Sequence, residues 1–210
     1  MTRQAVKLFI FDLGKVLIDF DFSIAIQRLE NFGKVDPSKV QGLFRTSSLS
    51  KKWDAGLMNG DEFFKTVRDE LELTIPIGQF LPIWNEIFTE NKETIRLAEI
   101  LNQSSRVLIL SNTNPWHAEY IRENFPWIHH FYDFIASCDV HLLKPDPEIF
   151  KLALKRGNAN PYETLYVDDM EENVRQTKSL GFDSILFTGI STLLPELKKR
   201  GIKIPASLVE

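Results

Sequence analysis

Four short apolar runs, each separated from the next by a helical pattern, constrain the fold of this 210-residue chain more than any other feature. Each run is too short for a buried helix and is rich in aliphatic or aromatic residues, which is typical of a strand buried on both faces. The runs cover residues 7–11 (KLFIF), 106–110 (RVLIL), 164–167 (TLYV) and 183–187 (DSILF). Buried strands that alternate with helices predict an α/β fold, with a Rossmann-like parallel sheet core and helices on both faces.

The first two runs are separated by about ninety residues with helical patterns and no strand pattern, which is too long for a single crossover helix. We therefore expect an inserted α-helical cap subdomain at residues 18–89, and a Rossmann-like catalytic core formed by residues 1–17 and 90–210. Amphipathic patterns predict helices at residues 22–32, 61–71 and 79–88 in the insertion, and at residues 91–101, 148–155, 171–180 and 191–200 in the core.

Charge and cysteine content narrow the class of protein. The 25 Lys and Arg residues are scattered among 29 Asp and Glu residues and the formal net charge is -4, so we expect no nucleic-acid partner. The single cysteine, Cys138, is expected to be a small buried hydrophobe. No apolar run approaches the roughly 20 residues that span a bilayer, and the N-terminus lacks the features of a signal peptide. We expect a cytoplasmic protein that does not enter membranes, and monomer and homodimer both stay open.

Polar side chains follow the first three apolar runs directly, at the point where each strand is expected to end. They are Asp12 after the first run, Ser111 and Asn112 after the second, and Asp168 and Asp169 after the third, with Lys144 preceding Pro145 at a later helix start. Each of these features alone can be a helix cap or a turn. Because the carboxyl ends of parallel strands meet at one edge of the sheet, we expect these side chains to converge there.

Together these residue types make a workable phosphoryl-transfer site. Asp12 can attack phosphorus and form an aspartyl-phosphate. Mg2+, which prefers oxygen ligands, would be held by Asp12, Asp169 and a carbonyl near Gly14. Lys144 and the Ser111 hydroxyl would stabilise the phosphoryl oxygens as negative charge develops on them.

The segments FIFDLGKVLID, LILSNTN, LLKPDPEIF and LYVDDMEENV resemble, in order, the four motifs of the haloacid dehalogenase superfamily. With an insertion after the first motif, the chain resembles the C1-capped group. The FDLG, WDAGLMNGDEFF and SNT segments are most similar to the bacterial sugar-phosphate phosphatase branch that includes an α-glucose-1-phosphate phosphatase.

This resemblance implies a role for each matching residue. It implies a nucleophile at Asp12, and Mg2+ binding by Asp12, Asp169 and the Gly14 carbonyl. It implies phosphate contacts from Ser111, Asn112 and Lys144, beside Leu13 and Gly14. Asp168 is expected in or just behind the metal site, and Asn173 in a supporting role. The expected substrate is a small-molecule phosphate ester.

Two positions depart from the pattern of the superfamily. Most of its phosphatases carry a second Asp two residues after the nucleophile, as general acid and then base, and here that position is Gly14. Since such help is worth about 10²- to 10⁴-fold, turnover of esters with poor leaving groups should be slow. Lys15 stands where a small residue is common, and either a phosphate contact or a solvent-facing loop position fits it.

Three functions compete on these residues. The first is a Mg2+-dependent phosphatase of a small phosphorylated metabolite, such as a sugar phosphate. The second is a hydrolytic dehalogenase, which also uses an Asp nucleophile and also lacks the second Asp, although the pair Asp168 and Asp169 favours a metal. The third is a catalytically weak binding or regulatory member, because of Gly14. Near the site, we expect His117 at the surface or just behind the site, and Trp53 in the core of the insertion rather than as a sugar platform.

Overall fold

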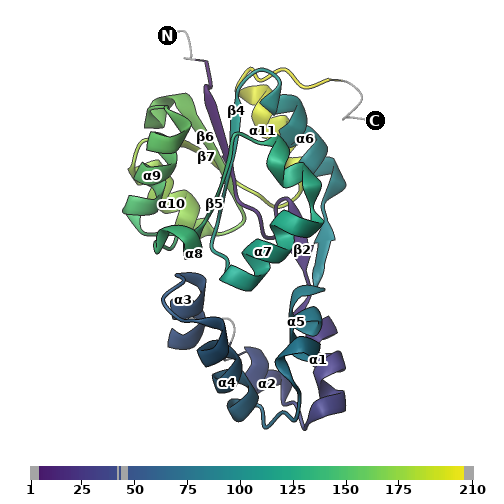
Figure 1. The fold of residues 1–210 in the computed structure, drawn as a ribbon. Helices are drawn as coiled ribbons and strands as arrows, with labels where there is room; N and C mark the ends of the chain where they lie inside the picture. The colour runs from purple at the N-terminus through teal and green to yellow at the C-terminus, as the bar shows by residue number, and fades with distance from the viewer. Residues whose placement is uncertain (1–4, 42, 44–46, 206–210) are drawn as a thin grey trace.

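The central feature of the computed structural model, which describes residues 5–41, 43 and 47–205, is a five-stranded parallel sheet (Figure 1). The strands lie in the order β5-β4-β1-β6-β7. Their bounds are β1 (Leu8–Phe11), β4 (Arg106–Ser111), β5 (Asp133–Ala136), β6 (Thr164–Asp168) and β7 (Asp183–Leu186). Phe11 at the end of β1 pairs with Ile109 of β4 and Val167 of β6. The predicted α/β class and the buried character of the central strands are confirmed.

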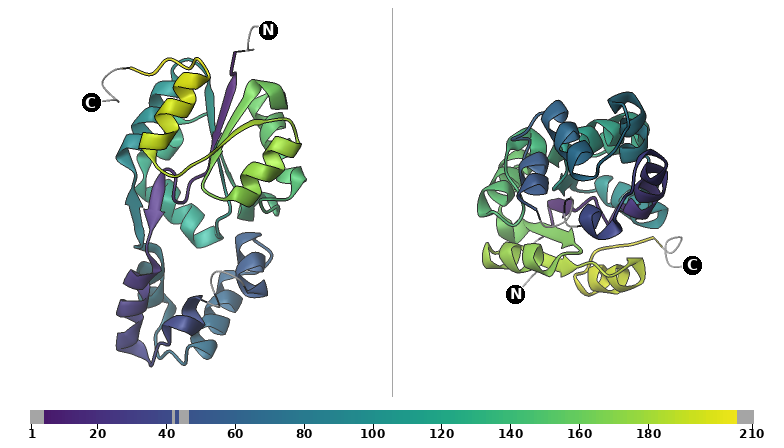
Figure 2. Two further views of the ribbon diagram at one scale, coloured as in Figure 1. Left: turned by 180° about the vertical axis from the view of Figure 1, so that it is seen from behind. Right: turned by 90° about the horizontal axis from the view of Figure 1, so that it is seen from below.

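Helices cover both faces of the sheet, as Figures 1 and 2 show. On one face, Phe9 and Phe11 pack with α6 (Lys92–Asn102), α7 (Pro115–Asn124) and α11 (Ile190–Lys199). On the other, Leu8 and Ile10 pack with α9 (Pro147–Gly157), beside α10 (Glu171–Ser179). Successive β1 residues therefore serve opposite faces, the alternation that a strand imposes on its side chains.

Short helices lie in several of the connections: the 3-10 helices η1 (Glu30–Phe32), η3 (Pro126–His130) and η4 (Pro161–Glu163), and the helix α8 (Ser137–Val140). The ends of two longer helices follow from their residue types. Asp146 caps α9 by accepting a hydrogen bond from the Glu148 amide, with Pro147 in the first turn. Gly181, at φ 88°, takes the left-handed backbone that ends α10.

The segment between β1 and β4 forms the inserted helices α1 to α5, beyond one end of the sheet (Figures 1 and 2). Their bounds are α1 (Phe22–Leu29), α2 (Pro37–Gln41), α3 (Ser48–Asp54), α4 (Gly60–Glu70) and α5 (Ile77–Asn85). They enclose an apolar cluster of their own, which includes Trp53, Phe63 and Phe80. None of the described helices is long and apolar enough to cross a membrane.

The expectation of no strand in this segment is wrong. Antiparallel β2 (Ile18–Phe20) and β3 (Phe88–Glu90) form a ribbon between the sheet and the inserted helices. Three residues per strand are too few for a periodic signal. The expected helix at residues 79–88 ends instead at Asn85, because the chain then turns into β3. The division at residues 18 and 89 falls inside this ribbon and stays a prediction.

Edge strand β5 and helix α7 were not predicted from the sequence. The run DFIA of β5 contains a charged residue and only two of its four residues are buried, because it pairs on one side with β4 alone. Its pattern therefore lacks the continuous apolar run of a central strand. Helix α7 begins at Pro115 and carries a mixed face, so its periodicity is weak.

Candidate active site

The sheet brings the predicted polar residues to one edge. Asp12 follows β1, Ser111 ends β4 and Asp168 ends β6, and the pairing of these three adjacent strands sets their ends level. Asp12, Ser111 and Asp168 are all buried. Lys144 reaches the same place from the loop before α9.

Lys144 bridges two carboxylates at the centre of the site. Its Nζ lies 2.7 Å from Asp12 Oδ1 and 2.8 Å from Asp168 Oδ2, and donates to the Leu110 carbonyl at 3.1 Å. An ammonium has three donors, so these acceptors use all of them. The Lys144 side chain is only 2% exposed, and its pKa is raised because Asp12 and Asp168 outweigh the cost of burial. The lysine is therefore a charged strut between the two carboxylates.

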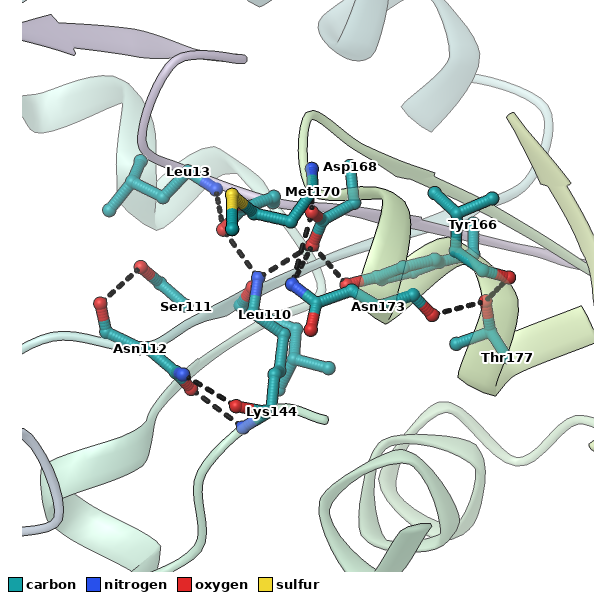
Figure 3. Close-up of polar contacts among 12 residues, drawn as sticks. Leu13, Leu110, Ser111, Asn112, Lys144, Tyr166, Asp168, Met170, Asn173 and Thr177 are labelled. Carbon is teal, nitrogen blue, oxygen red and sulfur yellow. Dashed lines mark hydrogen bonds and ion pairs between the residues drawn. The ribbon is translucent and has the colours of Figure 1, made fainter. Parts of the chain in front are cut away.

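The Asp168 carboxylate is fully surrounded by donors (Figure 3). Besides Lys144, the Met170 amide donates to it at 2.7 Å. Asn173 Nδ2 donates to its two oxygens, at 3.1 and 3.0 Å, and the Tyr166 hydroxyl donates to it by a short hydrogen bond. Burial pushes the pKa of Asp168 up, but Lys144 and these donors outweigh it and the pKa is lowered. Asn173 thus holds Asp168, and Asp168 holds Lys144.

Three carboxylates could hold a metal ion at this edge. Asp12, Asp168 and Asp169 each offer an oxygen, and these atoms all lie within 4.8 Å of one another. Asp168 is the least suitable ligand, because its donors already occupy its oxygens. Asp12 Oδ1 accepts from the Leu13 amide at 2.7 Å and from Lys144, and the Asp12 and Asp169 carboxyl groups lie within hydrogen-bonding reach of each other. Asp12 and Asp169, with Gly14 at the same cavity, are thus the better donor set for a hard cation.

Electrostatics at these two carboxyl groups favour a cation. Burial raises the pKa of Asp12 to about 7. The positive charge of Lys144 opposes this rise, and the negative charges of Asp168 and Asp169 add to it. Burial and the Asp168 charge also raise the pKa of Asp169. A divalent ion between them would restore both charged forms, because opposite charge lowers the pKa of a carboxyl group. The residues present therefore fit Mg2+.

Ser111 and Asn112 have different surroundings. The Asn112 amide holds the Lys144 backbone: Nδ2 donates to the Lys144 carbonyl at 2.9 Å, and Oδ1 accepts from the Lys144 amide at 2.8 Å. Asn112 therefore fixes the loop that presents the lysine (Figure 3). The Ser111 hydroxyl makes only a 3.4 Å contact with the Asn112 carbonyl, so it is free to turn toward a ligand.

Strand β2 of the ribbon covers the positions that follow Asp12. A Cβ at Gly14 would lie 3.0 Å from the Phe20 ring, so Phe20 takes part of the space of the missing side chain. Lys15, at φ 61°, folds back over that ring: its Nζ lies 4.6 Å from the ring centroid and donates to the Phe20 carbonyl at 3.0 Å. Its Nζ also lies 3.4 Å from Asp19. Lys15 is thus engaged with the ribbon, although it borders the cavity.

A cavity of about 610 Å³ lies between these residues and the inserted helices. Gly14, Ser111, Asn112 and Asp169 line it from the core, and the inserted helices add aromatic rings and Asp54. Trp53 is buried and stacks on Phe63 at 4.5 Å, as predicted for a core residue, but it also borders this cavity. The volume suits a small molecule.

His117 is buried and lines the cavity, so of its two expected positions the surface is wrong and a place beside the site is right. Its Nε2 lies 3.1 Å from the Trp84 carbonyl and its ring stacks on Trp84, because α7 runs under α5. Burial lowers the pKa of His117 to about 4. Cys138 is buried as predicted, and burial raises the pKa of its thiol to about 12.

The sequence analysis missed Tyr166, Asn114 and Asp54. Tyr166 had a signal, because a tyrosine in the middle of a buried strand needs a partner for its hydroxyl. Asn114 precedes Pro115, the usual order at a helix start, and caps α7 by accepting from the His117 amide at 3.0 Å. Asp54 lies within the WDAG segment and shows no signal of its own.

Comparison with known proteins identifies the family. The chain is 29% identical over 187 residues to D-ribitol-5-phosphate phosphatase from Bacteroides thetaiotaomicron, covering 85% of this chain and 90% of that enzyme. A crystal structure of a haloacid dehalogenase family enzyme from the same species has a TM-score of 0.81 and 25% identity, over 91% of this chain and 99% of that one. Its wild-type complex with magnesium and inorganic phosphate has a TM-score of 0.79 and 26% identity, over 90% and 99%. The model of the haloacid dehalogenase-like hydrolases matches residues 6–181, and this chain belongs to that family.

Proposed function

We propose that the protein is a Mg2+-dependent phosphatase that hydrolyses a small phosphorylated metabolite, a sugar or alditol phosphate, through an aspartyl-phosphate on Asp12. One observation carries the proposal: the buried Asp12 lies between a lysine and further carboxylates, and its neighbours Leu13, Gly14 and Asp169 line a cavity large enough for such a substrate. The similarity to a ribitol-phosphate phosphatase and to a structure with magnesium and phosphate bound supports it.

In this proposal Asp12 attacks the phosphorus atom. The new bond joins a carboxylate oxygen to phosphorus, and the bond from phosphorus to the ester oxygen breaks, so that an alkoxide leaves and takes a proton from water. Water then attacks the phosphorus of the aspartyl-phosphate, which restores the Asp12 carboxylate and releases inorganic phosphate. Because Oδ1 is held by Leu13 and Lys144, Oδ2 is the oxygen available for attack.

The surrounding residues would position and stabilise the charges. Lys144 orients Asp12 and opposes the rise in its pKa that burial causes, and its three occupied donors favour this role over the direct phosphate contact expected from the sequence. The Ser111 hydroxyl and backbone amides near Asn112 would contact the phosphoryl oxygens. Mg2+, held by Asp12, Asp169 and the Gly14 carbonyl, would neutralise phosphate charge.

The substrate class follows from Gly14 and from the relatives. Without a carboxyl group at position 14, esters with acidic hydroxyls, including an anomeric sugar hydroxyl, would react faster than simple alkyl esters. The α-glucose-1-phosphate phosphatase branch stays a prediction beside the alditol phosphate that the ribitol-phosphate relative favours. Residues 18–89 would act as a cap that closes over the cavity and excludes water.

The test is turnover of p-nitrophenyl phosphate with and without Mg2+, because its acidic leaving group needs no general acid. We expect activity with Mg2+ and its loss in EDTA. Asp169→Ala should raise the Mg2+ concentration for half-maximal activity by at least about tenfold, since it removes a direct ligand. Metal-independent release of halide from a 2-haloacid would point to a dehalogenase instead. Phosphate binding without either activity would point to a binding or regulatory member.

A further inference from the structure

Asp54, the last residue of α3, borders the cavity on the side of the inserted helices. Its side chain is partly accessible, and neither a lysine nor an arginine forms a recorded ion pair with it among the described residues. The proposed chemistry at Asp12 does not use this carboxyl group. A carboxylate in such a place is costly without donors, because burial weakens its solvation.

The Asp54 carboxyl group is held from the core. Burial raises the pKa of Asp54 to about 7, and the Asn114 side chain, as a hydrogen-bond donor to it, opposes that rise only in part. Asn114 Nδ2 also lies 2.9 Å from His117 Nδ1. His117 Nε2 faces the Trp84 carbonyl, an acceptor, so Nε2 carries the proton and Nδ1 accepts from Asn114. The two amide hydrogens of Asn114 thus serve His117 and Asp54. One residue thereby fixes the Asp54 carboxyl group and leaves its other lone pairs for donors in the cavity.

The backbone around Asp54 is fixed as well. The Ser137 hydroxyl donates to the Asp54 carbonyl at 2.5 Å, and His141 Nδ1 lies 2.9 Å from the Ala55 carbonyl. These contacts place α3 against α8 (Figure 1). A side chain held at both its backbone and its carboxyl group is preorganised, which lowers the entropy cost of binding a ligand.

The residue before Asp54 carries a hydrogen-bond donor. Trp53 Nε1 is buried, has no hydrogen-bond partner among the described residues, and belongs to a ring that borders the same cavity. An unpaired buried N–H costs about 1–3 kcal/mol, so such groups usually have a partner in the functional state. Phe22, Phe63 and Phe88 add apolar wall to this end of the cavity. Acceptor, donor and apolar wall together suit a polyhydroxylated carbon chain.

We propose that Asp54 accepts hydrogen bonds from hydroxyl groups of the substrate beyond its phosphate, and so selects alditol or sugar phosphates over simple alkyl phosphates. This inference rests on the proposed phosphatase function and deepens it. Asp54 is a specificity-determining residue here, opposite the reacting atoms. The Trp53 indole N–H contributes a donor to the same hydroxyl groups.

The test compares two five-carbon esters, ribitol 5-phosphate and n-pentyl phosphate, in the parent protein and Asp54→Asn. Both are primary alkyl esters, so a difference between them reports on the hydroxyl groups. Asn keeps the volume and can still meet Asn114, but it lacks the charge. Measured at about pH 8.5, above the pKa of about 7 that burial gives Asp54, the ratio of kcat/KM for ribitol 5-phosphate to that for n-pentyl phosphate should fall by about 10- to 100-fold in Asp54→Asn, as expected for hydrogen bonds to a charged group.

Two further variants complete the test. Asp69→Asn makes the same chemical change at an exposed residue of α4, outside the cavity lining, and should leave the ratio unchanged. Trp53→Phe keeps a ring and removes the N–H, and should lower the same ratio by a smaller factor. A ratio that stays the same in Asp54→Asn, whether both rates fall together or neither falls, would overturn the inference. Absence of Mg2+-dependent p-nitrophenyl phosphate turnover in the parent would instead overturn the proposed function.

Discussion

The cavity has a core wall, formed by the loops at the ends of the sheet strands, and an inserted wall, formed by the inserted helices. The two walls differ in how their charged groups are paired. Directly behind the core wall, Asp12, Lys144 and Asp168 form one chain of charges in which every ammonium donor has an acceptor. On the inserted wall, aromatic rings surround one carboxyl group, Asp54, that has no recorded cation partner among the described residues. The first arrangement is fixed by strand ends and by the loop before α9, and in the proposed function it serves one reaction. The second is fixed by side-chain packing and can differ between relatives without disturbing the first.

Asp12→Asn tests the core wall with the largest expected effect. An amide is a poor nucleophile, and the change also removes a negative ligand of the metal site. Turnover of p-nitrophenyl phosphate should fall by at least about 10³-fold, with only electrostatic and positioning effects left. The variant should still unfold cooperatively in urea, since Asn fills the same volume. Mg2+-dependent activity near the parent level would remove Asp12 from the role of nucleophile.

Lys144→Met asks how much the buried charges contribute to stability. Met fills the volume but leaves Asp12 and Asp168 without their cation, which should lower the free energy of unfolding by about 3–5 kcal/mol at pH 7. Because Asp168 has a pKa below its ordinary value of 3.8, its ion pair adds stability above that pH and loses it as the pH falls through the lowered pKa. The deficit of the variant should therefore shrink in acid.

Urea unfolding at pH 7 and at a series of pH values from about 4 downward measures this deficit. Lys151→Met is the matched control, because Lys151 pairs with Glu148 at 2.7 Å on an exposed helix surface. Exposed ion pairs contribute about 0–1 kcal/mol to stability, so this control should hardly change the free energy of unfolding. Equal effects of the two substitutions would mean that burial adds nothing to the Lys144 ion pairs.

Gly56→Ala tests how firmly the inserted wall is docked. Gly56 has φ 64°, and a Cβ there would lie 2.2 Å from the Cys138 carbonyl oxygen, so α3 must move away from α8. The left-handed backbone costs Ala about 1–2 kcal/mol, and the contact adds to it. Because Asp54 and Trp53 lie just before Gly56, KM for ribitol 5-phosphate should rise more than KM for p-nitrophenyl phosphate.

Gly201→Ala separates the two causes. Gly201 has φ 75° with nothing within 4 Å of a Cβ, so it carries the backbone cost without the clash. We expect a similar loss of unfolding free energy from the backbone cost and no change in either KM. A KM change in Gly201→Ala, or none in Gly56→Ala, would break the link between docking of α3 and substrate recognition.

The two walls also differ in what the sequence could predict. Asp12, Ser111, Lys144, Asp168 and Asp169 were predicted to meet, because strand ends in a parallel sheet converge whatever the intervening chain does. The family was predicted from the same residues and is confirmed. Their roles in catalysis stay predictions. Asp54 and Asn114 are sixty residues apart in the chain and meet only through the packing of α3 on the core. No local pattern encodes such a contact.

Gly14 is where the two walls touch, because Phe20 of the ribbon takes the space beside it. Gly14 does not need a left-handed backbone, so a side chain there is limited by the ring alone. An added Asp would require Phe20 to yield by a few tenths of an ångström. Lys15, already over that ring, could pair with the new carboxylate and lower its pKa.

Gly14→Asp is expected to give the smallest effect of the series. If no acid assists the leaving group, parent rates across phosphate esters should fall steeply as leaving-group pKa rises. The new carboxyl group should flatten that dependence and speed n-pentyl phosphate by up to about tenfold, below the 10²- to 10⁴-fold of a well-placed acid, because Phe20 restricts its rotamers. Adding Phe20→Leu should enlarge the gain, and adding Lys15→Gly should raise the pKa of the new acid.

A flat dependence in the parent would mean that another group supplies the proton or that hydrolysis of the aspartyl-phosphate limits the rate. A pre-steady-state burst of alcohol would identify the second case.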